Sequence, residues 1–299
     1  MQTIAVTGGS GFLGREVCSL LQSSPIYKPL IIGRQQISET GGIEYRSTDY
    51  TRDSLTQALA NVDAVVHLAS VKGANGTIAD YHPNELVMER LLENCAALGI
   101  RNIVYASSIS VYSDTSEIPW RETHIPTPKT LYGVSKLACE HIGGIYHNLY
   151  GLNIKSLRIA HILGEGERKG YMMNTFMDLA FEHKTLKVIG QSIAKREFVY
   201  VKDAARAILL ALSKPEVHGV FNIGSGEAYS NLEIARFVNE RFENTGNLEY
   251  VSTVDEGIES SLMDSSKAHR ILGYAAGYSF AEALDDIRKI KLEGVAKHV

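Results

Sequence analysis

The chain has 299 residues, 44% of them hydrophobic and 21% charged, so it can bury one large core or two coupled lobes. Its net charge of −4 and the lack of Lys/Arg-rich runs argue against a nucleic-acid partner. No stretch approaches the ~20 apolar residues of a membrane span. Cys18, Cys95 and Cys139 are widely spaced and expected to be reduced, and no His or Cys spacing suggests a metal site. We therefore expect a cytoplasmic protein with no metal, membrane or nucleic-acid partner.

Short apolar runs alternate with amphipathic stretches along the first two thirds of the chain. The predicted strands are residues 4–6, 30–32, 64–67, 103–106, 154–159 and 220–223. The predicted helices are residues 12–21, 85–98, 131–149 and 204–212. Continuous apolar strands separated by helices are typical of a parallel sheet that is covered on both faces. The sequence therefore predicts an α/β fold with a doubly wound parallel sheet of the Rossmann type.

The strand–helix alternation weakens after Gly164. Residues 165–198 are more polar and contain one predicted helix at 174–182. Ser230 and Glu233 have the spacing of a capping box, which predicts a helix that begins at Asn231. We predict a dinucleotide-binding domain of residues 1–164 plus 199–225. A smaller C-terminal substrate lobe would contain residues 165–198 plus 226–299.

The first predicted strand is followed by the glycine-rich segment TGGSGFLG and then by a helix. Gly8 permits a tight turn, Gly11 allows the backbone to approach a pyrophosphate, and Gly14 allows close packing of helix on strand. The free N–H groups of the helix N-terminus favour phosphate binding. This arrangement predicts a dinucleotide site that includes Phe12 and Leu13.

The second predicted strand ends in IIGR, where a dinucleotide site for NAD usually has an acid that binds the adenosine ribose. Gly33 stands at the acid position, and Arg34 can pair with a ribose phosphate. This pattern favours NADP over NAD, although Arg34 can also be an ordinary solvated loop residue. Asp49 and Tyr50 follow the third strand and either flank the adenine or belong to a polar loop that caps the next helix.

Tyr132 and Lys136 are four residues apart in a predicted helix, so their side chains share one face. A tyrosine has an ordinary pKa of about 10, and a nearby ammonium group stabilises its anion. Tyr132 is therefore a candidate for exchanging a proton with a substrate oxygen while a hydride moves. Ser108, at the carboxyl edge of the sheet, is the candidate for orienting that oxygen. Alternatively, Ser107 and Ser108 only cap the strand end.

These segments resemble an extended short-chain dehydrogenase/reductase of the NAD(P)-dependent epimerase/dehydratase family, nucleotide-sugar epimerase or ketoreductase type. The resemblance is carried by TGGSGFLG, VVHLAS, SSISVY, YGVSK, LRIAHILG, REFVYVKDAA, FNIGSG and MDSSKAHRILGY. It implies that Ser108, Tyr132 and Lys136 form the catalytic triad. VVHLASVK is similar to a stretch of UDP-galactose epimerases, which implies that Lys72 lies near the cofactor. The family resemblance also implies that Arg196 binds a nucleotide diphosphate.

The candidate sites can now be stated together. The residues assigned to the dinucleotide are Gly8, Gly11, Phe12, Leu13, Gly14, Arg34, Asp49, Tyr50, Leu68, Ala69, Ser70, Lys72, Asn84, Ser107, Tyr132, Lys136 and His161. The residues assigned to the substrate are Ser108, Asn174 and Arg196.

Three departures from the family pattern narrow the function. Ile109 and Ser110 stand where dehydratases have an acidic pair, which argues against water elimination. His161 replaces a common strand-end Asn and either is a polar residue satisfied by the backbone or touches the nicotinamide amide or the sugar. The segment TVDEGIESSLMD lacks the Arg that many nucleotide-sugar members have, which leaves Arg196 alone for the diphosphate.

We therefore expect hydride transfer at a hydroxyl or keto carbon of a nucleotide-activated sugar, by either an epimerase or a ketoreductase. One alternative is a reductase of a non-nucleotide carbonyl substrate, and another is a catalytically silent dinucleotide-sensing protein. The loop between Ser113 and Thr130 either closes over the substrate or is a surface excursion. By the resemblance, we expect a homodimer that pairs the helices at 86–98 and 131–149.

Overall fold

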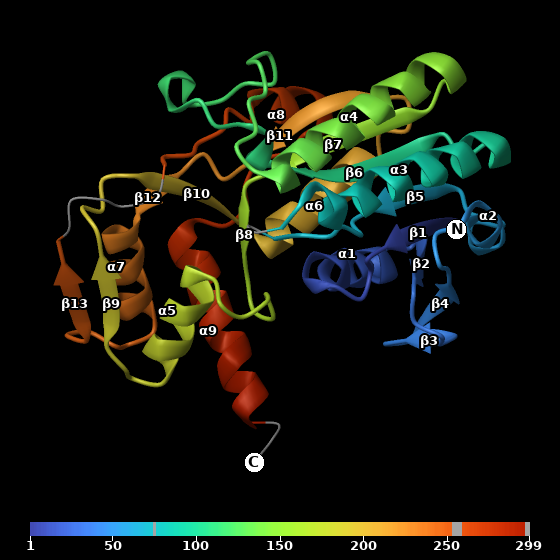
Figure 1. The fold of residues 1–299 in the computed structure, drawn as a ribbon. Helices are drawn as coiled ribbons and strands as arrows, with labels where there is room; N and C mark the ends of the chain where they lie inside the picture. Colours follow the sequence, from blue (N-terminus) through green and yellow to red (C-terminus); the bar gives the residue numbers. More distant parts are fainter. Residues whose placement is uncertain (74–75, 253–258, 297–299) are drawn as a thin grey trace.

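The computed structural model describes residues 1–73, 76–252 and 259–296. Its centre is an eight-stranded sheet of order β11-β7-β6-β5-β1-β2-β4-β3, in which only the edge strand β3 is antiparallel to its neighbour (Figure 1). The strands are β1 (Gln2–Thr7), β2 (Tyr27–Gly33), β3 (Glu39–Thr40), β4 (Ile43–Ser47), β5 (Ala64–His67), β6 (Asn102–Ser108), β7 (Asn153–Ile159) and β11 (Gly219–Ile223). The predicted α/β fold with a doubly wound, mostly parallel sheet is confirmed.

Helices cover both faces of this sheet because the strands are apolar on both sides. α1 (Phe12–Ser23) and α6 (Val201–Leu212) pack together on one face. α2 (Arg52–Ala58), α3 (Ile78–Leu98) and α4 (Leu131–Tyr150) cover the other. In β1, Ile4 and Val6 join the core under α1 and α6, whereas Ala5 joins the core under α3 and α4. The sheet therefore separates two hydrophobic cores.

A smaller lobe lies beside the large sheet, on the left in Figure 1. It contains the sheet β12-β10-β8 and the parallel pair β13-β9. Its strands are β8 (His161–Leu163), β9 (Leu186–Ile189), β10 (Lys195–Tyr200), β12 (Ala228–Ser230) and β13 (Leu248–Val251), and its helices are α5 (Met172–Phe181), α7 (Asn231–Arg241) and α9 (Phe280–Ala296). A third core, including Phe176, Ile234 and Leu284, holds these helices on the strands.

The structure differs from the sequence-based division at two places. β8 lies within the predicted first domain but pairs with β10, in the three-stranded sheet of the smaller lobe. α8 (Ser266–Leu272) was placed in the substrate lobe, yet it packs against β11 and α6. The division into two domains stays a prediction.

Two helix starts illustrate how local sequence sets the elements. α7 begins at Asn231, and Ser230 and Glu233 form the predicted capping box. α3 begins at Ile78, seven residues before the predicted start, behind a capping box of Thr77 and Asp80. Pro83 lies inside α3 near its N-terminus. Pro83 is the sixth residue of α3, past the first turn, so it lacks the N–H that would otherwise donate to the carbonyl oxygen of Ala79 and removes one hydrogen bond from the helix.

The described cysteines, Cys18, Cys95 and Cys139, are buried and unpaired. Burial raises the pKa of the Cys18 and Cys95 thiols to about 12. Among the described residues, no helix combines the length and apolar composition that a bilayer span requires. In the same part of the chain, no three His, Cys, Asp or Glu side chains are grouped as a metal site needs. The cytoplasmic location stays a prediction.

Candidate active site

The glycine-rich loop makes close backbone approaches that only glycine allows. Gly8 has a left-handed φ of 71°, and a Cβ there would lie 2.9 Å from the amide nitrogen of Ala69. A Cβ at Gly14 would overlap the carbonyl oxygen of Gly8. Gly11 caps α1 without a side-chain hydrogen bond, so the first-turn N–H groups face a cavity whose wall includes Phe12 and Leu13. This cradle fits a pyrophosphate.

The loop after β5 forms the next part of the same wall. Thr7 Oγ1 lies 3.2 Å from the amide nitrogens of both Leu68 and Ala69, which holds the start of this loop against β1. Leu68, Ser70 and Lys72 line the cavity.

Asn84 supports this loop from inside the protein. Its side chain accepts from the N–H of Val71 at 2.7 Å and donates to Ser135 Oγ at 3.1 Å. It is buried and is not among the residues that line the cavity. The structure thus shows Asn84 joining the β5 loop to α4, and its assignment to the dinucleotide stays a prediction.

Ser108, Tyr132 and Lys136 come together at the carboxyl end of β6. Ser108 ends β6, and its side chain is hydrogen-bonded to Tyr132. α4 can begin close to Ser108 because residue 133 is a glycine. Any larger residue there would place its Cβ on the carbonyl oxygen of Ser110. Thr130 caps the helix by accepting from Gly133 N at 3.0 Å. All three predicted catalytic residues line the cavity that the glycine loop also borders.

Burial controls the ionisation of the Tyr132–Lys136 pair. It raises the pKa of Tyr132, and the hydrogen bond with Ser108 acts in the opposite direction. Burial, together with the charge of Lys72, lowers the pKa of Lys136 to about 8. Lys136 Nζ donates to the carbonyl oxygen of Ala106 at 2.7 Å and lies 5.6 Å from the centre of the Tyr132 ring. The net effect is a raised Tyr132 pKa, and Lys136 is not among the groups that lower it, in contrast to the lowering that we expected from the spacing of the two residues.

A buried ion pair fixes α4 beneath the catalytic side chains. Glu140, one turn after Lys136, lies 2.6 Å from the guanidinium of Arg158 on β7, and both side chains are 4% exposed. Ser107 Oγ donates to Glu140, and Ser107 lines the cavity together with its neighbour Ser108. Arg158 also donates to the hydroxyl of Tyr112 at 2.6 Å. Ser107 is thus tied to the support of α4, and its assignment to the dinucleotide stays a prediction.

The smaller lobe supplies the opposite wall of the cavity. His161 at the start of β8 and Arg196 on β10 both line it. Arg196 donates to Asn231 Oδ1 at 2.8 Å, which directs its guanidinium along this wall. His161 is exposed at the cavity surface, and desolvation there, with the charges of Arg196 and Lys72, lowers the pKa of His161 below its usual range, so its imidazole is neutral at physiological pH. A neutral ring and a cation side by side suit a sugar diphosphate.

The sequence did not identify every residue of this wall. Glu167, Arg168 and Tyr171, in the loop between β8 and α5, line the cavity. Asn174 instead is buried behind them and donates to the carbonyl oxygen of Arg168 at 2.6 Å. One sequence signal could have identified Glu167, Arg168 and Tyr171. They come shortly after the strand-end segment LRIAHILG, and in parallel sheets ligands bind at such strand ends.

At the end of β2, the hydroxyl of Tyr45 from β4 fills the space that an acidic side chain at position 33 would need. A Cβ at Gly33 would overlap the hydroxyl of Tyr45, which accepts from the N–H of Gln35 at 3.1 Å. The guanidinium of Arg34 lies 5.6 Å from the centre of the Tyr50 ring. An acid cannot stand at position 33 unless Tyr45 moves. The exposed cation there is Arg34.

Asp49 has a local structural task. It accepts from Thr51 N at 2.9 Å and from Ser54 Oγ at 2.5 Å, and these hydrogen bonds lower its pKa to about 2. It therefore stabilises the start of α2, as one of the two interpretations of this segment expected. Tyr50 adopts a left-handed φ of 63° and buries its ring. Contact of either residue with an adenine stays a prediction.

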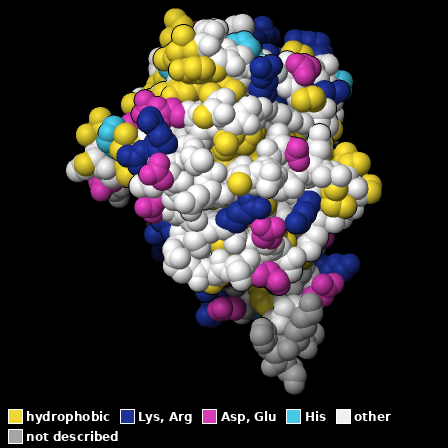
Figure 2. Space-filling view, turned by 90° about the vertical axis from the view of Figure 1, so that its right-hand side faces the viewer, with side chains coloured by type: hydrophobic (Ala, Val, Ile, Leu, Met, Phe, Trp, Pro, Cys, Tyr) yellow, Lys and Arg dark blue, Asp and Glu magenta, His cyan; other side chains and the backbone are white. Residues whose placement is uncertain are grey.

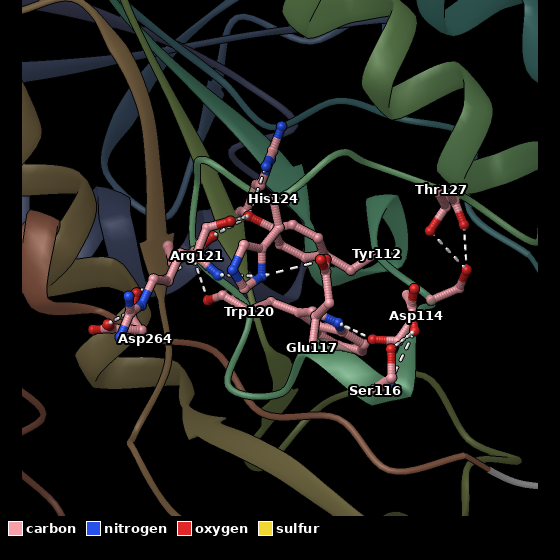
Figure 3. Close-up of polar contacts among 12 residues, drawn as sticks. Tyr112, Asp114, Ser116, Glu117, Trp120, Arg121, His124, Thr127 and Asp264 are labelled. Atoms are coloured by element: carbon pink, nitrogen blue, oxygen red, sulfur yellow. Dashed lines mark hydrogen bonds and ion pairs between the residues drawn. The ribbon is translucent and has the colours of Figure 1, made fainter.

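The loop between Ser113 and Thr130 is anchored to the segment that follows the undescribed residues 253–258 (Figure 3). Trp120 stacks on Tyr112 with ring centres 5.2 Å apart, and its indole donates to the carbonyl oxygen of Asp114. Arg121 pairs with Asp264 at 3.3 Å. Among the described residues of this loop, only Thr130 lines the cavity. Apart from Thr130, the loop does not border the cavity in this structure, and closure of the loop over the substrate stays a prediction. Part of the predicted arginine-free segment lies outside the described residues.

The cavity between the two walls has a volume of about 520 Å³. This is within the range of small-molecule sites, roughly 300–1,000 Å³. Gly8 and Gly11 of the glycine loop, Tyr132 of α4, and Arg196 and Phe198 of the smaller lobe all line it. The arrangement can hold a dinucleotide and a second anionic molecule with a proton-transferring phenol beside both.

Comparisons with known proteins agree with this geometry. The model of the NAD dependent epimerase/dehydratase family matches residues 4–224. The chain is similar to a solved UDP-N-acetylglucosamine 4-epimerase from Bacillus cereus, with 45% identity, 97% of this chain and 96% of that chain covered, and a TM-score of 0.89. It is also similar to a UDP-glucuronic acid 4-epimerase from Bacillus cereus, solved with UDP-glucuronic acid and NAD (26% identity, 98% and 99% covered, TM-score 0.85).

A UDP-glucose 4-epimerase from Lacticaseibacillus casei is 29% identical over 96% of this chain and 94% of its own length. The family match spans more than half of the residues, including the glycine loop and the triad. The chain therefore belongs to the NAD dependent epimerase/dehydratase family, as its motifs predicted.

Proposed function

We propose that this chain transfers hydride at a hydroxyl or keto carbon of a UDP-activated hexose. The observation that carries the proposal is the single cavity in which Ser108, Tyr132 and Lys136 lie between the glycine loop and Arg196. The loop offers free N–H groups to one diphosphate, and Arg196 offers a cation to another. Relatives that cover nearly the whole chain are named for UDP-sugars, which supports the same substrate class.

In this proposal, Tyr132 moves the proton. Its phenol takes the proton of a sugar hydroxyl during oxidation and returns it to a carbonyl oxygen during reduction. Ser108, already hydrogen-bonded to Tyr132, holds that oxygen in place. The ammonium group of Lys136 stabilises the phenolate while it exists. The bound dinucleotide supplies the hydride acceptor or donor.

Two reactions fit this site. A 4-epimerase is supported by three relatives named for that reaction, one of them 45% identical. A ketoreductase is supported by the end of β2, where the Tyr45 hydroxyl replaces an acid and Arg34 offers a cation to a ribose phosphate. From the same observation, we propose NADP rather than NAD as the cofactor. The structural neighbour that was solved with NAD supports the alternative, in which NAD is the cofactor.

The quaternary structure proposed is a homodimer through α3 and α4. On α4, Val134, Ile145 and Leu149 are exposed along one stripe. Figure 2 views the molecule from the end where α3 and α4 finish, and it shows hydrophobic side chains gathered near the top. An apolar surface of this kind marks an interface. We also propose that the first domain binds the dinucleotide and the smaller lobe binds the sugar nucleotide.

The variant Tyr132→Phe tests the proposed function. It keeps the ring but removes the hydroxyl that moves the proton, so we expect turnover of UDP-glucose or UDP-N-acetylglucosamine to fall at least ~100-fold. Dinucleotide affinity, measured by calorimetry, should change less than twofold. Tyr150→Phe, on the exposed end of the same helix, is the matched control and should behave like the wild type.

Three results would contradict the proposal. Undiminished turnover by Tyr132→Phe would remove the proton route. Turnover only of simple ketones would favour a reductase of non-nucleotide carbonyls. Dinucleotide binding without turnover of any UDP-hexose or ketone would favour a sensing protein.

A further inference from the structure

Glu167 is the one carboxyl side chain that lines the cavity among the residues the structure describes. It lies in the loop between β8 and α5, on the wall of the smaller lobe. The side chain of Asn174 is hydrogen-bonded to it, and Asn174 is itself buried and held by the carbonyl oxygen of Arg168. Burial raises the pKa of Glu167, whereas Lys72 and Asn174 act in the opposite direction. Asn174 thus supports the carboxyl group where it borders the cavity.

Lys72 approaches the same place from the first lobe. Its ammonium group lies 4.9 Å from the centre of the Tyr171 ring, four residues after Glu167. The charge of Lys72 also lowers the pKa of Lys136 and of His161. Lys72 therefore lies within electrostatic reach of both the catalytic and the substrate-facing groups. Glu167 is the negative charge on the cavity wall that balances it.

The charges of Glu167 and Lys72 affect which sugar the cavity can bind. The hydroxyl groups of a neutral hexose can donate hydrogen bonds to a carboxylate, which accepts at two oxygens. A uronic acid would instead bring a second carboxylate beside Glu167 and would compete with it for Lys72. Two like charges that share one site disfavour each other, and sites use such repulsion to reject wrong ligands. Family members differ in this property, since one structural neighbour is named for an N-acetylhexosamine and another for a uronic acid.

We propose that Glu167 is a specificity-determining residue that admits UDP-activated neutral hexoses and N-acetylhexosamines and excludes UDP-uronates. The proposal rests on the proposed function, because it assumes that the sugar nucleotide occupies the cavity. In this proposal Glu167 acts on the sugar, whereas Arg196, on β10, acts on the diphosphate.

Calorimetry with the full chain, loaded with dinucleotide, tests the proposal through binding of UDP, UDP-N-acetylglucosamine and UDP-glucuronate. The wild type should bind UDP-N-acetylglucosamine at least as tightly as UDP, and UDP-glucuronate at least tenfold more weakly than UDP. Glu167→Gln keeps the shape but removes the charge, so the ratio of UDP-glucuronate to UDP affinity should rise at least tenfold. Glu165→Gln is the matched control, because Glu165 pairs with Lys291 at 2.9 Å and does not line the cavity.

The possible results separate this proposal from the function it rests on. If the wild type binds UDP-glucuronate as well as UDP, or if Glu167→Gln leaves the ratio unchanged while UDP-sugars still bind, Glu167 does not set specificity. If no UDP compound binds the wild type at all, the proposed function fails as well. A shift in Glu165→Gln equal to that in Glu167→Gln would also overturn the assignment, because the effect would then not come from the cavity wall.

Discussion

The side chain of Arg34 is expected to decide which of two cofactors this site prefers. Its guanidinium is exposed beside the Tyr50 ring, and the Tyr45 hydroxyl keeps an acid out of position 33. A guanidinium binds a phosphate through charge-assisted hydrogen bonds that an unphosphorylated ribose cannot offer. We predict that Arg34→Ala weakens NADPH binding at least tenfold, about 1.4 kcal/mol, and changes NADH binding less than twofold. Fluorescence titration of each reduced cofactor measures this.

The control for this cofactor prediction is Arg270→Ala, an exposed arginine on α8 far along the chain from β2. It removes the same charge from the protein, so it separates a local contact from a change in net charge. A wild type that binds NADH more tightly than NADPH would contradict the cofactor proposal. Equal losses in both arginine variants would contradict the local contact.

Single residues were predictable where chemistry and short spacing coincide. Tyr132 and Lys136 share a helix face, and Ser108 ends a strand, so the topology of the sheet brings them together. Glu167 and Tyr171 were not predicted, because their place depends on how the smaller lobe packs across the cavity. Asn84 was assigned to the cofactor, but no spacing reveals that its amide faces Val71 and Ser135 inside the protein.

At the scale of elements, the buried pair Glu140–Arg158 joins α4 to the sheet below the active site. Removing one partner of such a pair leaves an uncompensated buried charge, which costs about 3–5 kcal/mol. We predict this loss in the free energy of unfolding for Glu140→Ala, measured by urea titration. The exposed pair Arg52–Glu93, with Arg52 69% exposed, is the control, and Glu93→Ala should cost less than about 1 kcal/mol.

The double variant Glu140→Leu with Arg158→Met should recover much of the stability, because it removes both charges together. A loss below about 1 kcal/mol for Glu140→Ala would show that water or local rearrangement solvates Arg158. A double variant as unstable as Glu140→Ala would show that packing, and not charge, holds α4 in place.

Elements were predictable where their pattern is continuous. β5 is apolar up to its last residue, His67, and β7 places Ile154, Leu157 and Ile159 among polar residues. The bounds of both strands match the predicted runs within one residue. The start of α3 was wrong by seven residues because periodicity begins only after Pro83, whereas the structure begins the helix at the Thr77–Asp80 capping box. β3 was not predicted, since a two-residue edge strand has too few residues to show any period.

At the scale of the whole molecule, the exposed stripe on α4 supports the proposed dimer. Ile145 and Leu149 are 54% and 67% exposed and are four residues apart, so they lie on one face of the helix. Burying a large apolar side chain contributes about 1.5–3 kcal/mol, so these two would contribute substantially to association. We predict that Ile145→Asp with Leu149→Asp converts a dimer into a monomer in light scattering, because a paired interface would then bury four carboxylates near its two-fold axis. Ile189→Asp, at an equally exposed site on β9, should leave the dimer intact. Tyr132 and Lys136 belong to the same helix, so the turnover of the monomer is informative. A monomer that keeps full turnover would show that its own sheet holds α4 in place. A monomer with reduced turnover and an unchanged free energy of unfolding would show that the partner subunit helps to position the catalytic residues. A wild type that is monomeric at micromolar concentration would contradict the proposed dimer.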